Sequence, residues 1–500
     1  MKLRFPAFVL SCLFMTASPA SARWLEARSA NFIVYSEGSE KALRDSTALL
    51  EDYDALLRTL TGTSAPPSRS PLKVYLVDTA AKLREVADVP AQAAGFYSAR
   101  VGGTAAFAVR SNDPLMDGQE ILLHEYAHHF TNRYYPAWYP GWYSEGLAEY
   151  LSTARILPDR IEIGRYNPGR AITLLRGTWL PAERVLAPGR KPISKGEMGQ
   201  FYAESWLIVH YLFATEERKQ ALVRYLADLH RGVAEETAFR SAFAMDHRAF
   251  DQQLRLYMGG RIAYGTMRRE ATSTPAIAIK PLPDSADAVI LPHAALTIGI
   301  PRAEREQEIL AAARQAAARF PDDPYAQRVL ARAEINSGDR ARGTTLIETL
   351  IEKTPHDPEL LYIRGTADFY TGRKDAAVRA ERFAAARPWF ARAVEADPAY
   401  YTALYRLAQT TPPGSGDEVA LEQLRTAHEL APLVGDIAID TTSALMARKR
   451  YAEALAVIQP VATNPHGGNA ARAAALYAEV RTALADQAES QADGAERLSR

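Results

Sequence analysis

The 500-residue sequence predicts an α+β domain, in which helices pack on a small mixed β-sheet, followed by an all-α array of repeated helix pairs. Two observations support this fold class. In the first half of the chain, short runs of β-branched and aromatic residues, which predict strands, lie between longer runs with the 3.6-residue period of amphipathic helices. In the second half, a dipeptide that ends in proline, in most cases Asp-Pro, recurs about every 34 residues, which is typical of stacked helix pairs.

The chain divides on this basis into five segments. Their boundaries follow changes in composition and in the period of the apolar residues. Proline-rich stretches mark a linker, and a polar run marks a tail. The segments are a signal peptide over 1–22, the α+β domain over 23–265, a linker over 266–284, the helical repeats over 285–484 and a disordered tail over 485–500.

Residues 1–22 have the composition of a secretory signal peptide. Lys2 and Arg4 precede an apolar run over 5–15, and small residues supply a cleavage site after Ala22. The apolar run is short for a membrane span, and the sequence has no second run of its kind, so we expect no transmembrane segment after cleavage. These features predict an exported protein.

Cysteine and charge content narrow the location and the partners. Cys12, the sole cysteine, lies within the signal, so the mature chain would have neither disulfides nor thiolate ligands. This suits the periplasm or cell envelope of a bacterium, and a lipoprotein acylated at Cys12 is the alternative. Acidic and basic residues number 59 each, so nothing favours nucleic acid as a partner.

The α+β domain opens with alternating strands and helices. Runs of β-branched and aromatic residues predict strands, and leucines at helical spacing predict an amphipathic helix. The expected elements are a strand over 31–35, a helix over 39–60, a strand over 72–77, and a hairpin of 95–98 with 104–109 that turns at Gly102-Gly103.

A five-residue motif then carries the chemistry: residues 124–128 read His-Glu-Tyr-Ala-His. On an α-helix, residues four apart lie on one face, so His124 and His128 can both reach one metal ion. Glu125 is close enough to take a proton from water that a zinc ion activates. His129 points about 100° away from this face, so we expect it to be a packing or surface residue.

Zinc requires a third protein ligand, and a second segment predicted to be helical offers two candidates for it. Residues 142–150 read Trp-Tyr-Ser-Glu-Gly-Leu-Ala-Glu-Tyr, and Glu145 and Glu149 fall on one helix face. An HExxH helix followed by such a W-x-x-E-G-x-A-E-Y segment resembles the gluzincin metallopeptidases. A structural polar network, or a zinc site without activity, are the alternatives.

The gluzincin resemblance implies a zincin-like fold and one Zn²⁺ per chain. It implies that His124, His128 and Glu145 are the metal ligands and that Glu149 hydrogen-bonds a ligand histidine. Glu149 as the third ligand is the alternative. The resemblance also makes Glu125 the catalytic base.

Two further features follow from the same resemblance. Residues 200–212 are similar to the gluzincin helix whose early tyrosine faces the metal, so Tyr202 is the candidate donor to the transition-state oxyanion. A purely structural tyrosine is the alternative. Gluzincins also pair an edge strand with an extended substrate, and 104–109 is our candidate for this strand, with an ordinary covered edge as the alternative.

The second half of the chain resembles tetratricopeptide (TPR) repeats, since paired helices with a proline between units recur with a period near 34 residues. A unit exposes an apolar face that only a neighbour covers, so several must stack. An insertion near 381–386 would explain the long unit, 284–320 would form a degenerate first unit and 469–484 a closing helix. The boundary pairs are Asp323-Pro324, Asp357-Pro358, Asp397-Pro398, Ala431-Pro432 and Asn464-Pro465.

These features predict a zinc peptidase of the envelope that hydrolyses peptide bonds in a peptide or protein substrate. Its TPR domain would bind a protein partner. The alternative is a scaffold of the cell envelope whose peptidase-like domain is catalytically inactive. The complete motif favours the peptidase, because a scaffold has no need of Glu125.

Overall fold

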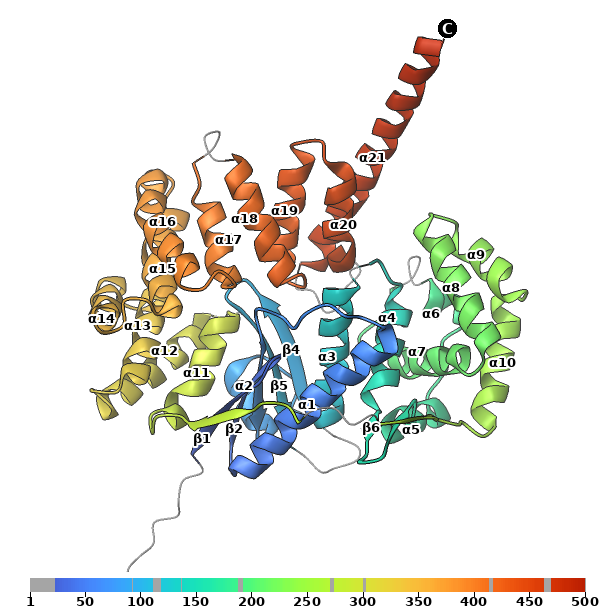
Figure 1. Ribbon diagram of the computed structural model, residues 1–500, viewed down its shortest axis with the longest axis horizontal. Helices are drawn as coiled ribbons and strands as arrows, with labels where there is room; N and C mark the ends of the chain where they lie inside the picture. Colours follow the sequence, from blue (N-terminus) through green and yellow to red (C-terminus); the bar gives the residue numbers. More distant parts are fainter. Residues whose placement is uncertain are drawn as a thin grey trace, which may run out of the picture.

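The computed structural model describes most of the chain from Arg23 onward, and it is mainly helical with a small mixed sheet near the N-terminus (Figure 1). The predicted signal peptide, with Cys12, and the pair Asn464-Pro465 lie outside the described residues. The described ranges are 23–91, 93–110, 118–135, 137–187, 192–269, 274–299, 303–412, 417–462 and 469–499.

The larger sheet in the described residues has six strands in the order β4-β5-β3-β2-β1-β9. The β2–β3 and β3–β5 pairs are parallel, and the other pairs are antiparallel. The two predicted strands and the predicted hairpin are confirmed. The strands are β1 (Trp24–Arg28), β2 (Phe32–Glu37), β3 (Leu72–Val77), β4 (Gly95–Arg100), β5 (Gly103–Val109) and β9 (Ala278–Pro281).

Helices cover both faces of this sheet because its central strands are apolar on both sides. On one face, Val74 and Leu76 of β3 pack in a core with α1 (Glu40–Thr61) and α3 (Gly118–Tyr134). On the other face, Tyr75 and Val77 pack in a core with α2 (Ala80–Val86) and α11 (Ala286–Ile298). Since α11 is the first helix of the repeats, the repeat array is fused to the sheet through a shared core.

The helix predicted over 39–60 is confirmed as α1, and its ends show why it begins and stops there. The Ser39 side chain accepts a hydrogen bond from the backbone N–H of Ala42 and so caps the first turn. At the other end Gly62 adopts a left-handed conformation, with φ of 69°, and its N–H binds the carbonyl of Arg58.

Two expectations about the sheet are wrong. The strand over 104–109 is not an edge, because β5 lies between β4 and β3, and the edge on that side is β4. Residues 266–284 are not a free linker: β8 (Gly265–Arg268) pairs with β7 (Arg160–Ile163), and β9 pairs with β1. The alternating Ile277 and Ile279 pack on the core, and a proline is tolerated on an edge strand such as β9.

A helical subdomain completes the first half of the chain and packs around α7 (Met198–Phe213). Its short strand β6 pairs with β7. The remaining elements of this part are α4 (Gly141–Ser152), β6 (Arg155–Ile156), α5 (Pro168–Arg176), α6 (Ala182–Leu186), α8 (Glu216–His230), α9 (Glu235–Phe243) and α10 (His247–Gly259).

The predicted helix pairs of the second half are confirmed, and Figure 1 shows them curving around the sheet from one side to the top. Asp323 and Asp357 cap their helices through their carboxylates, and the prolines that follow occupy the first helical turn. The helices after α11 are α12 (Ala303–Arg319), α13 (Pro324–Ser337), α14 (Arg340–Lys353), α15 (Pro358–Lys374), α16 (Arg379–Ala396), α17 (Tyr401–Gln409), α18 (Asp417–Leu430), α19 (Gly435–Met446), α20 (Tyr451–Ala462) and α21 (Ala470–Ser499).

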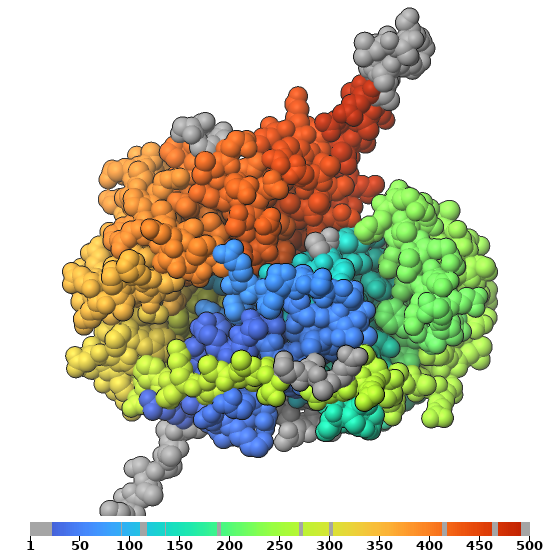
Figure 2. Space-filling model, in the orientation of Figure 1, coloured from blue at the N-terminus to red at the C-terminus, as the bar shows by residue number. Residues whose placement is uncertain are grey.

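The surface shows how these parts meet. In the space-filling view, the array, coloured yellow to red, lies directly against the blue sheet region, and the green helical subdomain lies on the other side of the sheet region (Figure 2). Helix α21 projects from the rest of the molecule (Figure 1). The sheet region therefore lies between the array and the helical subdomain.

Details of the array differ from the prediction. The extra residues of the long unit lengthen both of its helices, to 17 residues in α15 and 18 in α16, against 14 in each of α13 and α14. The predicted disordered tail over 485–500 is wrong as far as Ser499, because α21 continues to that residue. Its alanine, glutamate, glutamine and arginine residues are polar overall but strong helix formers. Among the described residues, no helix is long and apolar enough to cross a membrane.

Candidate metal centre

The candidate centre lies where α3 packs against α4. One side of α3 is buried against the sheet through Leu122, Tyr126 and Phe130, so the adjoining face, with His124 and His128, turns toward α4. Apolar burial therefore positions α3 and α4 without any contribution from a metal ion.

Close packing of α4 on α7 depends on Gly146. A Cβ atom at this position would lie 2.2 Å from the carbonyl oxygen of Ser205 and 2.7 Å from Cγ2 of Val209, so only glycine allows the two helices to approach this closely. This contact holds Glu145, the preceding residue, and Tyr202 of α7 in one neighbourhood.

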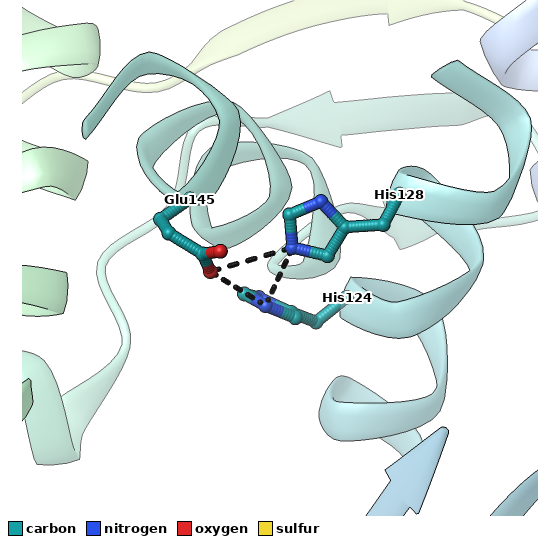
Figure 3. A group of neighbouring side chains, drawn as sticks. All are labelled: His124, His128 and Glu145. Carbon is teal, nitrogen blue, oxygen red and sulfur yellow. Dashed lines mark hydrogen bonds and ion pairs between the residues drawn. The ribbon is translucent and has the colours of Figure 1, made fainter. Parts of the chain in front are cut away.

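Three side chains converge in this space (Figure 3). The His124 Nε2 to His128 Nε2 distance is 3.2 Å, and the Oε2 atom of Glu145 lies 3.4 Å from His124 Nε2 and 3.3 Å from His128 Nε2. In a tetrahedral zinc site with bonds of about 2.0–2.1 Å, two ligand atoms are about 3.3–3.4 Å apart. The three donor atoms therefore fit a zinc ion, and they are of the types that zinc prefers.

The centre is largely buried and rich in carboxylates. The Glu145 side chain is 0% exposed, while those of His124 and His128 are 13% and 12% exposed. Burial lowers the pKa of His124, but its hydrogen bond with Glu145 and the charges of Glu149, Glu125 and Glu145 outweigh burial and raise that pKa to about 9. The carboxylates thus favour a positive charge at this point of the protein.

The second nitrogen of each histidine faces a further polar side chain. The Oε1 atom of Glu149 lies 3.5 Å from His124 Nδ1, and the Ser144 hydroxyl lies 3.3 Å from His128 Nδ1. Glu149 is therefore on the side of the His124 ring away from Glu145, which is the position of an orienting partner. Glu149 is not part of the group of three donor atoms found among the described residues.

Arg170 of α5 holds Glu149 in turn. Its Nε atom donates to Glu149 Oε2 at 2.9 Å and its terminal nitrogen donates to Oε1 at 2.5 Å. A two-point pair of this kind fixes the plane of the carboxylate as well as its position.

The two predicted catalytic side chains border the same space. Tyr202, in the first turns of α7, has its ring centroid 6.5 Å from that of His124, with the rings edge to face. Burial raises the pKa of Tyr202, and the charges of Glu145 and Glu125 raise it further. Glu125 is half-buried, and its charge acts on both His124 and Tyr202.

His129 has the packing role expected from its direction on the helix. Its Nδ1 atom lies 3.0 Å from the hydroxyl of Tyr97 on β4, and its ring stacks on Tyr126 at 5.7 Å. Burial lowers the pKa of His129 to about 3, so it is neutral at physiological pH.

Ser144 and Arg170 are site residues that the sequence did not predict. Ser144 directly precedes Glu145, and its position one helical step from the ligand could have indicated a contact. Arg170 follows Glu149 by 21 residues, on another helix, and no local pattern links the two.

The similarity of this chain to known proteins is weak and comes from structure comparison. No family model matches the chain, and no curated relative matches it. Among solved structures, it is similar to a thermophilic TPR protein from Thermus thermophilus, with 18% identity, a TM-score of 0.32, and coverage of 40% of this chain and 98% of the other. It is also similar to MamA from Desulfovibrio magneticus RS-1, with 17% identity, a TM-score of 0.26, and coverage of 41% and 98%. The helix pairing itself is what identifies a TPR-like array.

Proposed function

We propose that this chain is an exported zinc-dependent peptidase whose TPR-like array binds a protein partner. The observation that carries the proposal is the near-equilateral triangle of donor atoms from His124, His128 and Glu145, whose sides match a tetrahedral zinc site. The gluzincin-like motifs point to the same ligands and to peptide-bond hydrolysis.

The protein side chains would divide the work of hydrolysis. A zinc ion held by His124, His128 and Glu145 would polarise the scissile carbonyl and lower the pKa of water. Glu125 takes the proton of the attacking water and passes it to the leaving amine. Tyr202 donates a hydrogen bond to the carbonyl oxygen as it gains negative charge, and its raised pKa keeps it protonated for this purpose.

Side chains next to the two histidines hold their rings in the orientation that a metal ion requires. Glu149, fixed by two bonds from Arg170, places its Oε1 atom 3.5 Å from the second nitrogen of His124, and its charge there favours the ring orientation that presents Nε2. Ser144 serves His128 in the same way.

The composition of residues 1–22 supports export, and the absence of cysteine from the mature chain supports a bacterial periplasm or envelope. The array of helix pairs supports the second candidate, an inactive peptidase-like scaffold, because such arrays serve binding on unrelated proteins.

Glu125→Gln distinguishes the two functions, because it removes the base and leaves the three donor atoms in place. The assay is hydrolysis of internally quenched peptides of randomised sequence by the mature chain, with zinc content measured alongside. We expect cleavage by the parent, retained zinc and a loss of at least about a hundredfold in rate for Glu125→Gln. The exposed Glu217→Gln is the matched control and should cleave normally.

Equal rates for the parent and Glu125→Gln would contradict the peptidase mechanism. Zinc binding without cleavage of any peptide in the set would favour the inactive scaffold.

A further inference from the structure

The inner side of the helical array encloses a groove of about 950 Å³. Its walls come from the first helix of each pair, α11, α13, α15, α17 and α19, with contributions from the neighbouring helices. The turn between β4 and β5, at residues 100–102, forms a further wall, so the groove lies between the array and the domain that carries the metal centre.

The β4–β5 turn is firmly held there. The hydroxyl of Tyr401 on α17 donates to the carbonyl of Arg100 at 3.2 Å and lies 3.0 Å from the hydroxyl of Thr104. Val101 is buried in a core with Tyr401 and other residues of α17 and α18. The groove is therefore a built feature with a rigid wall on each side.

The groove is strongly basic although the whole chain is neutral. Eight basic and three acidic side chains line it, whereas the chain has 59 of each. Arg373, Lys374 and Arg379 are exposed around the loop between α15 and α16. Within the described part of the chain, none of these three has a carboxylate within ion-pair distance. Such an excess attracts an anionic ligand.

Arg406, on α17, is a buried charge in the same groove. The residue is 7% exposed, its guanidinium lies 4.6 Å above the ring of Phe369, and one terminal nitrogen donates to the Gln409 side chain at 2.7 Å. Its Nε atom has no hydrogen-bond partner, and no described carboxylate lies within ion-pair distance. Asp440 is linked to Arg406 through Gln409, because the Asp440 carboxylate accepts hydrogen bonds from the side chains of Gln409 and Tyr405.

A buried guanidinium without a counter-ion is costly, and a carboxylate that accepts two bonds along its edge removes that cost. Phe369 covers one face of the Arg406 guanidinium, so the edge of the group is what a ligand can meet. This favours a carboxylate as the group that binds there.

The acidic residues of the groove narrow the class of ligand. Two of the three, Asp436 and Asp440, lie on α19, away from the basic loop at α15 and α16, and the third, Glu306, lies on α12. A polypeptide can present carboxylates to the basic end and backbone N–H groups to the acidic end. A single-stranded nucleic acid carries one negative charge per nucleotide along its whole length and would be repelled by the acidic end.

We propose that this groove binds an extended polypeptide segment rich in aspartate or glutamate, with one carboxylate on Arg406 and others on the loop cations Arg373, Lys374 and Arg379. This gives a chemical identity to the protein partner of the proposed function, but it does not depend on zinc or on hydrolysis. A bound segment would touch the β4–β5 turn and thus the domain that carries the metal centre.

The test is the fluorescence anisotropy of a short labelled peptide of alternating glutamate and glycine, titrated with the mature chain. We expect binding that weakens as salt rises from about 50 mM to about 300 mM. A glutamine–glycine peptide of the same length should bind at least about tenfold more weakly. An oligothymidylate of matching length tests the nucleic-acid alternative.

Two variants test the residues. Arg373→Glu with Lys374→Glu reverses two exposed charges and should weaken binding at least about tenfold, as should Arg406→Gln. The control reverses two exposed cations of the array that do not line the groove, Arg319→Glu with Lys353→Glu, and should bind normally. The loop variant keeps the test valid even if Arg406→Gln does not fold, because its positions are exposed.

Equal binding of the two peptides, or full binding by the loop variant, would overturn the proposal. Binding of the oligothymidylate alone would replace it with a nucleic-acid groove. Glu145→Ala separates this inference from the proposed function, because it should lose zinc and still bind the acidic peptide.

Discussion

The glycine between the two site glutamates makes a strong quantitative prediction. In Gly146→Ala, the new Cβ would lie 2.2 Å from the Ser205 carbonyl oxygen, where ordinary contact begins near 3.4 Å. The clash is with backbone, which cannot rotate away, so α4 and α7 must separate by about 1 Å. Overpacking of this kind costs about 1–3 kcal/mol, and we expect the upper end because Val209 is also too close, at 2.7 Å.

Thermal unfolding of the mature chain measures this cost. A loss of about 3 kcal/mol should lower the unfolding temperature of the first domain by about 6–12 °C. Gly199→Ala is the matched control on α7, since a Cβ there meets nothing within 4 Å and the substitution restricts the unfolded chain. Gly199→Ala should therefore be neutral or stabilise slightly. A Gly146→Ala protein as stable as its parent would refute the argument that α4 and α7 need glycine at their contact.

Three further predictions follow from the structure. Glu149→Gln should lower zinc affinity by about 10–100-fold in a chelator competition, because the charge behind His124 is lost, whereas Glu217→Gln should have no effect. Removal of zinc by a chelator should lower the unfolding temperature of the parent, since the metal binds only the folded chain, and should leave Glu145→Ala unchanged. Burial lowers the pKa of His428 to about 4, so the stability that this neutral histidine contributes is complete above pH 6.5 and is lost as the pH falls toward 4. Denaturant titrations should therefore show that, between pH 7 and pH 5, the unfolding free energy of His428→Leu falls by about 1–2 kcal/mol less than that of the parent.

Local signals in the sequence predicted much of the fold. The β-branched and aromatic runs in 31–35 and 72–77, the leucine spacing of 39–60 and the pairs Asp323-Pro324 and Asp357-Pro358 each specify an element through signals within a few residues. The position of His124 and His128 on one helix face follows likewise from helical spacing, whereas the resemblance to gluzincins, and not spacing, singled out Glu145 as the third residue of the group.

The features that the sequence did not reveal depend on contacts between distant segments. The pairing of β9 with β1 joins residues about 250 positions apart, and the edge position of β4 is decided by β5 pairing with β3. The bond of Arg170 to Glu149 has the same origin. The basic groove was hidden for a further reason, because its charges come from many helices and cancel in the composition.

The zinc content of the purified mature chain, measured by elemental mass spectrometry beside that of Glu145→Ala, tests the central claim most directly. The geometry of the three donor atoms predicts about one zinc ion per parent chain and almost none in the variant. A parent chain without zinc under metal-replete conditions, or equal zinc in the two proteins, would contradict the assignment of His124, His128 and Glu145 as a metal centre.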